Sequence, residues 1–101
     1  MSIVVVFDET IARIILSGEL DYSTQEEIRR ENNKALAAAH IKEIQVNLAD
    51  VTFLDSSVIR ALLILQKSAS EDGKSLTLLN CSQSIREIFE IGGFDKMFTI
   101  R

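Results

Sequence analysis

The chain has 101 residues, of which 47% are apolar and 26% charged, in the proportions of a single folded domain with one core. This composition excludes a disordered chain. The net charge of −4 argues against a nucleic-acid-binding surface, which needs clustered lysine and arginine. The only adjacent basic pair, Arg29-Arg30, is surrounded by Glu26, Glu27 and Glu31, and we interpret it as part of a solvated helix face.

The sequence also bears on where the protein acts. Its longest apolar runs, Ile3–Phe7 and Ala61–Leu65, are far shorter than the roughly 20 residues needed to span a bilayer. No charged and apolar leader opens the chain, and the single cysteine, Cys81, cannot form an internal disulfide. We therefore expect a cytoplasmic protein that does not insert into membranes.

The first half of the chain predicts a hairpin, a helix and a strand. Two apolar segments, Ile3–Phe7 and Ile11–Leu16, flank a polar turn, as in a β-hairpin. The segment Ser23–Ala39 is rich in helix formers and carries an apolar stripe, with Ser23 or Thr24 as its expected cap. Glu43–Leu48 alternates and then runs apolar, which is typical of a strand buried against helices.

The second half continues the alternation of helices and strands. We expect a helix at about Ser57–Glu71, a strand at Ser75–Asn80, a helix from near Ser82 to Gly92-Gly93, and a last strand at Met97–Ile100. The order ββαβαβαβ predicts an α/β fold in which residues 1–101 form one domain. Its mixed, mostly parallel sheet would have about five strands, with three or four helices packed on it.

Function in such sheets tends to lie just beyond the carboxyl ends of the strands. There the segment Val51–Ser57 joins an apolar strand to an apolar-faced helix through Asp55, Ser56 and Ser57. Since Asp and Ser side chains cap helices, one of the three is expected to be the cap. A hydroxyl here can also receive a phosphoryl group, which would lie against exposed amides and the positive end of the helix dipole.

At about 100° per residue, the helix that follows has two distinct faces. The predicted core stripe consists of Val58, Ala61, Leu62, Leu65 and Ala69. The second face combines a hydroxyl, two apolar side chains and two cations: Ser56, Ile59, Arg60, Leu63 and Lys67. Our hypothesis is that the second face binds a partner, with Ile59 and Leu63 as apolar anchors. The alternative is that neighbouring elements simply bury both anchors.

Two charged residues have both a structural and a functional interpretation. Arg60 lies one helical turn after Ser56, so it either pairs with a phosphate added there or is simply an exposed arginine. Asp21 precedes the helix that begins near Ser23, where it either caps that helix or contacts the acceptor hydroxyl or its kinase.

Four segments occur in an order and spacing that indicate a family. They are Leu16–Asp21, Val46–Leu48, Val51–Ser57 and Arg86–Phe94. Together they resemble the STAS domain of bacterial anti-sigma factor antagonists. The resemblance implies that the unphosphorylated protein binds a serine kinase that is usually an anti-sigma factor, that this kinase phosphorylates Ser56, and that a PP2C-type phosphatase removes the phosphate. Asp55, Ser57, Asp21 and Arg60 would then support the phosphosite.

One departure from the family pattern lies directly after the acceptor pair. The family commonly has Gly-Leu-Gly after the acceptor pair, whereas this chain has Val58-Ile59-Arg60, which is bulkier and adds a cation. Similar domains also act as adaptors without a sigma factor, either in a phosphorelay with another output or in complexes that transport lipids or anions. Such an adaptor is the alternative function.

An enzyme is the competing class. His40, the only histidine, follows the first predicted helix at an expected surface position, and Cys81 lies on a strand-to-helix turn where a small buried residue is common. The chain has no glycine-rich phosphate loop, no metal-spaced His or Cys cluster and no Gly-x-Ser-x-Gly turn. The sequence therefore predicts a binding protein without catalysis, metal or cofactor.

Overall fold

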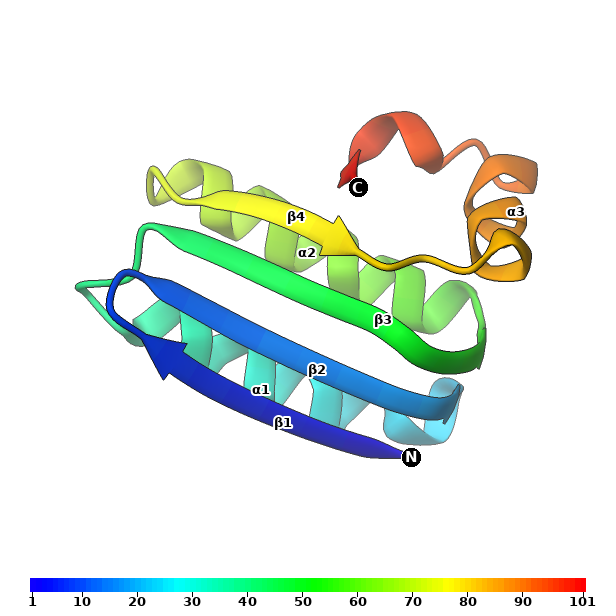
Figure 1. Cartoon of the computed structure of the whole chain (residues 1–101), viewed down its shortest axis with the longest axis horizontal. Helices are drawn as coiled ribbons and strands as arrows, with labels where there is room; N and C mark the ends of the chain where they lie inside the picture. The colour runs from blue at the N-terminus through cyan, green and yellow to red at the C-terminus, as the bar shows by residue number, and fades with distance from the viewer.

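The computed structural model describes all residues 1–101 and contains one five-stranded sheet (Figure 1). The strands lie side by side in chain order: β1 (Ser2–Asp8), β2 (Ile11–Leu20), β3 (Glu43–Leu54), β4 (Ser75–Leu79) and β5 (Thr99–Ile100). β1 pairs antiparallel with β2, and the other three pairs are parallel. The predicted α/β fold with a mixed, mostly parallel sheet is therefore confirmed.

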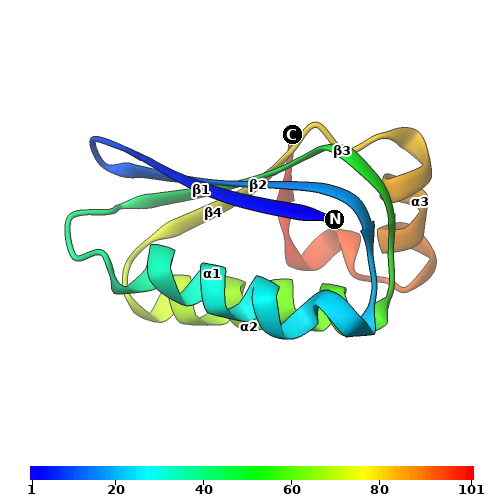
Figure 2. The same cartoon turned by 90° about the horizontal axis from the view of Figure 1, so that it is seen from below.

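Three α-helices connect the parallel strands: α1 (Gln25–Ala37), α2 (Ser56–Glu71) and α3 (Gln83–Ile91). Two short 3-10 turns, η1 (Tyr22–Thr24) and η2 (Asp95–Met97), precede α1 and β5. α1 and α2 lie side by side against one face of the sheet, whereas α3 lies beyond the end of β4 (Figures 1 and 2). None of these helices is long and apolar enough to cross a membrane.

One apolar core fills the space between the sheet and the helices. Because side chains alternate between the faces of a sheet, every second residue in parts of β2 and β3 points into this core. These buried residues are Ala12, Ile14, Leu16, Ile44, Val46 and Leu48. The predicted stripe of α2 is buried as expected: Val58, Ala61, Leu62, Leu65 and Ala69. Apolar residues thus recur every two positions in the strands and about every 3.6 positions in the helix, which gives each element one apolar face and accounts for the two layers.

β2 and β3 extend further than the sequence predicts. Their pairing register shifts between Ile15 and Ser17 and again between Gly18 and Glu19. Such irregularities bend strands, and Figure 2 shows both strands curving towards the helix layer at their C-terminal ends. The bend brings the ends of β2 and β3 next to the first turns of α1 and α2, where the candidate site lies.

The last strand is shorter than predicted. Only Thr99–Ile100 pairs with β4, because Met97 belongs to the turn η2 and not to the sheet. α3 ends before Gly92-Gly93 as expected, and Gly93 has the left-handed backbone conformation with φ of 74°. The chain then turns back so that Phe94 approaches the flank of α2.

Candidate functional site

Asp55 is the cap of α2 and also joins α2 to the end of β2. Its Oδ1 accepts hydrogen bonds from the N–H groups of Ser57 and Val58, at 3.0 and 3.2 Å, and from Ser57 Oγ at 2.5 Å. Its Oδ2 accepts the N–H of Tyr22 at 2.9 Å. The backbone N–H of Asp55 in turn donates to the carbonyl of Leu20 at 3.2 Å. One residue therefore holds a strand end and a helix start together.

The hydrogen bonds to Asp55 decide its charge. Burial raises the pKa of the carboxyl, but the bonds from the Ser57 hydroxyl and from the N–H groups of Val58, Ser57 and Tyr22 outweigh burial and hold this pKa below its usual value. Asp55 is therefore ionised at neutral pH. Its negative charge lies at the positive end of the α2 dipole, which stabilises it further.

This arrangement corrects one expectation about the site. We expected a phosphate to lie against exposed helix amides, but three N–H groups of the first turn are already bonded to Asp55. The N–H groups of Ser57 and Val58 bond to the Asp55 side chain, and that of Ile59 bonds to the Asp55 carbonyl at 3.1 Å. The N–H of Ser56 is not among these bonded groups, but the three that are bonded are not available to a phosphate here.

The two adjacent serines have different environments. Ser57 is half-buried, and its hydroxyl donates to Asp55. Ser56 is exposed, and its hydroxyl makes no hydrogen bond within the protein. The structure thus leaves Ser56 as the accessible hydroxyl of the pair.

Asp21 repeats the same local arrangement one strand away. Its Oδ1 accepts the N–H and the hydroxyl of Ser23, at 3.0 and 2.5 Å, and caps η1. The capping role is therefore the one observed for Asp21. Neither residue that we expected as the cap of α1 serves in that way, because Ser23 bonds back to Asp21 and the Thr24 hydroxyl donates to the Asp21 carbonyl. Asp21 makes no hydrogen bond to Ser56.

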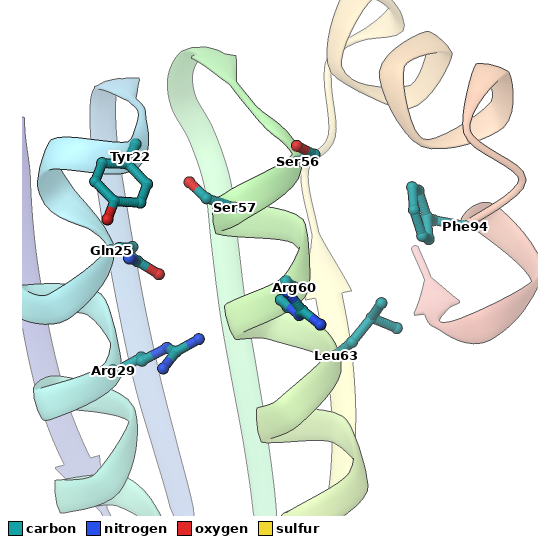
Figure 3. Close-up of a pocket in the computed structure, with 8 residues that line it drawn as sticks. All are labelled: Tyr22, Gln25, Arg29, Ser56, Ser57, Arg60, Leu63 and Phe94. Carbon is teal, nitrogen blue, oxygen red and sulfur yellow. The ribbon is translucent and has the colours of Figure 1, made fainter.

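A hollow of about 500 Å³ opens beside Ser56, between the first turns of α1 and α2 (Figure 3). Its lining residues are Tyr22, Gln25, Arg29, Ser56, Ser57, Arg60, Leu63 and Phe94. Figure 3 shows Arg29 extending from α1 towards α2, where Arg60 lies one turn after Ser56. No carboxylate lines the hollow, and neither arginine takes part in an ion pair. The hollow is therefore locally cationic in a chain whose net charge is −4.

Only part of the predicted partner-binding face of α2 is exposed. Arg60 and Lys67 are exposed and Leu63 is half-buried. The prediction that Ile59 is a surface anchor is wrong, since Ile59 is 3% exposed and belongs to the core. The reason is tertiary: Ile59 lies inside the core cluster, and Leu63 and Phe94 pack against that cluster as partly buried residues.

Sequence reasoning missed four lining residues: Tyr22, Gln25, Arg29 and Phe94. Arg29 was interpreted as part of a solvated face. Its side chain is exposed, but it extends towards α2 (Figure 3). The spacing of Gln25 and Arg29, four residues apart, does place both on one helix face, but only the packing of α1 against α2 shows what that face meets.

The remaining polar candidates lie outside this hollow. His40 is exposed, with its ring centroid 6.5 Å from that of Phe7. Cys81 is half-buried, and burial raises the pKa of its thiol more than the nearby Arg86 lowers it, so the thiol is protonated at neutral pH. No three His, Cys, Asp or Glu side chains gather as a metal site would require.

The sequence profile of the STAS domain matches residues 2–101, and the chain belongs to this family. Within it, the protein is related to the anti-sigma factor antagonists. It is 30% identical over 87 residues to a STAS-domain containing protein of Pseudomonas aeruginosa, covering 86% of this chain and 84% of the relative. It is 32% identical over 85 residues to the anti-sigma F factor antagonist of Lysinibacillus sphaericus, covering 84% and 72%.

Solved structures show the same fold. The anti-sigma factor antagonist SpoIIAA in its unphosphorylated form is 24% identical, with a TM-score of 0.77 over 99% of this chain and 87% of that one. The phosphorylated form of the Bacillus SpoIIAA gives 0.76 at 24% identity, over 99% and 91%. The resemblance found in the sequence is thereby confirmed, and the STAS family of anti-sigma factor antagonists to which the chain is related is non-enzymatic.

Proposed function

We propose that the protein is a cytoplasmic phosphoregulated binding switch. Its unphosphorylated form binds a serine kinase of the anti-sigma factor type, phosphorylation of Ser56 by that kinase releases it, and a PP2C-type phosphatase restores binding. The observation that supports this most is the difference between the two serines. Ser56 presents a free, exposed hydroxyl to a kinase, whereas the hydroxyl of Ser57 is bonded to Asp55.

The proposed partner-binding surface consists of Ser56, Arg60, Leu63 and Lys67 on α2. These residues are spaced by four, three and four positions, which puts them on one stripe of the helix. Three of them are exposed, and Leu63 is half-buried with an apolar side chain at the wall of the hollow. A surface with two cations around an apolar centre fits a partner that presents carboxylates around an apolar side chain.

Phosphorylation changes this surface without breaking a contact of the fold. In the transfer, the Ser56 Oγ–P bond forms, the bond from the γ-phosphorus to the β–γ bridging oxygen of the kinase's nucleoside triphosphate breaks, and the hydroxyl proton passes to the kinase. The product carries about −1.5 to −2 charge. Because Ser56 is exposed and unbonded, the fold loses no contact. A partner docked on it would trap an uncompensated charge, and every 1.4 kcal/mol of that cost weakens binding about tenfold.

The experiment that tests the switch compares wild type with Ser56→Ala, Ser56→Asp and Ser57→Ala in its native cell. Intact mass of the isolated protein should show a phosphate in wild type and Ser57→Ala but not in Ser56→Ala. In pulldowns read by mass spectrometry, wild type and Ser56→Ala should retain a kinase that folded Ser56→Asp loses. A folded Ser56→Asp protein that binds this partner as tightly as wild type contradicts the proposal.

The second candidate is an adaptor without phosphorylation, for example in a transport complex. It is favoured by Val58-Ile59-Arg60, which replaces the glycines common in the antagonists and adds the exposed cation Arg60 to the binding face. This adaptor would use the same stripe of α2. Absence of phosphate under all growth conditions, together with a partner that is not a kinase, supports it over the switch.

A further inference from the structure

A phosphate on Ser56 meets an unusual electrostatic setting. The first-turn N–H groups of Ser57, Val58 and Ile59 all bond to Asp55, so they are not available to a new anion. The ionised carboxylate of Asp55 is on the adjacent residue and repels a dianion. Cations that reach a phosphate at this position would therefore hold it against the protein surface.

Two cations are placed to do so. Arg60 follows Ser56 by one helical turn, and residues four apart on a helix are neighbours. Arg29 comes from α1, lines the same hollow and extends towards α2 (Figure 3). Both side chains are exposed and neither has an ion-pair partner, so nothing in the protein competes for them. Gln25 and the two serines are the other polar side chains of the hollow besides the Tyr22 hydroxyl.

We propose that Arg29 and Arg60 form a clamp that binds the phosphate of phosphorylated Ser56 within the same molecule. This inference rests on the proposed function, in which Ser56 is the acceptor. Guanidinium groups suit the role because their N–H donors pair with two phosphate oxygens at once. The phosphate then links α1 to α2 across the hollow.

The clamp changes how the switch works. In the unphosphorylated protein the two arginines are free to meet acidic groups of a partner. In the phosphorylated protein they are bound to a dianion of nearly equal and opposite charge. Phosphorylation thus removes attraction for an acidic partner, in addition to placing a negative charge on the docking surface.

The test uses the full chain with phosphoserine incorporated at position 56 during translation, so that no kinase is needed. The second pKa of the phosphate, about 6 when unperturbed, is followed by ³¹P NMR titration. We expect it to be lower in the wild-type background than in Arg29→Gln/Arg60→Gln by roughly 0.5 unit or more, because nearby cations favour the dianion. Each single variant should give part of the shift. The Nε–H resonances of both arginines should move over the same pH range.

Arg30→Gln and Lys67→Gln are the matched controls. Each removes an exposed cation from α1 or α2 that does not line the hollow, and neither should change the phosphate pKa. Equal pKa values in the wild-type background and the double variant, or equal effects of the control variants, overturn the clamp. The proposed function is judged separately, by the phosphate found or not found on Ser56 in native cells. A failure of the arginine clamp is thus distinguishable from a failure of the proposed phosphorylation switch.

Discussion

Removing the carboxylate of Asp55 should destabilise the protein much more than removing that of Asp21. The two residues look equivalent, because each accepts the N–H and the hydroxyl of the serine two positions later. Asp55 does more, since it also accepts the N–H of Val58 in α2 and, with its second oxygen, the N–H of Tyr22 after β2. The variants Asp55→Ala and Asp21→Ala separate these contributions.

The expected magnitudes follow from the bonds that each variant loses. Replacing the cap of a long helix costs about 0.5–2 kcal/mol, and losing the bond to Tyr22 adds about 1 kcal/mol. We therefore expect Asp55→Ala to lower the free energy of unfolding by about 1.5–3 kcal/mol and Tm by about 6 °C or more. Asp21 caps only the three-residue turn η1, so its loss should cost about 0.5–1 kcal/mol.

The cost of Asp55→Ala should also depend on pH. The pKa of Asp55 is lowered in the folded protein from a reference value of 3.8, so its stabilising effect is fully present well above that value and is lost as the pH falls through the folded pKa. The difference between wild type and Asp55→Ala should be constant near neutral pH and shrink on acidification below about pH 4. Asp55→Asn keeps a capping oxygen without the charge, so its free energy of unfolding should lie between those of wild type and Asp55→Ala.

Urea denaturation followed by far-UV circular dichroism, at pH 7 and at several acidic pH values, gives these free energies. Asp21→Ala serves as the internal control for loss of a carboxylate at a capping position. The reasoning is refuted if Asp21→Ala costs as much as Asp55→Ala. It is equally refuted if the cost of Asp55→Ala is the same at every pH.

Other side chains give further expectations. Ile59→Ala should lower the free energy of unfolding by about 2–4 kcal/mol because Ile59 is in the core. Leu63→Ala, at a half-buried position, should lower it by about 1 kcal/mol. If urea denaturation gives the reverse order, the burial of Ile59 is contradicted. Asn32 is 3% exposed, neither atom of its amide group has a hydrogen-bond partner, and it lines a second hollow of about 210 Å³ between α1 and α2. Asn32→Leu should therefore raise the free energy of unfolding by about 1–3 kcal/mol, and a lower Tm would show that the amide is needed. The thiol of Cys81 should react with iodoacetamide at pH 7.5 more slowly in the folded protein than in urea, because its pKa is raised by burial; equal rates would contradict this.

Most of the fold could be predicted from the sequence because it depends on local periodicity. Alternating and 3.6-residue apolar patterns mark the strands and helices correctly, and the glycines after α3 mark its end. The ends of β2 and β3 could not be placed, since Ser17-Gly18 and Ala49-Asp50 interrupt the apolar pattern while the strands continue through register shifts. Hydrogen bonding between strands, which the pattern does not contain, decides these ends.

The candidate site divides in the same way. The relation of Ser56 to Asp55 and Arg60 is local, so helix geometry alone places them together. Ile59 could not be placed correctly, because a projection of one helix does not contain the core residues that come from other parts of the chain. Arg29 was missed for the same reason: its position opposite α2 exists only when two helices pack side by side.

The strand order has a consequence for how the molecule is made. Every strand after β1 pairs with the one that precedes it in the chain, so the sheet can grow strand by strand as the polypeptide leaves the ribosome. The serine junction and both arginines are synthesised before Phe94. The wall of the hollow that Phe94 supplies is therefore added last, and a nascent chain exposes the kinase target before the finished recognition surface exists.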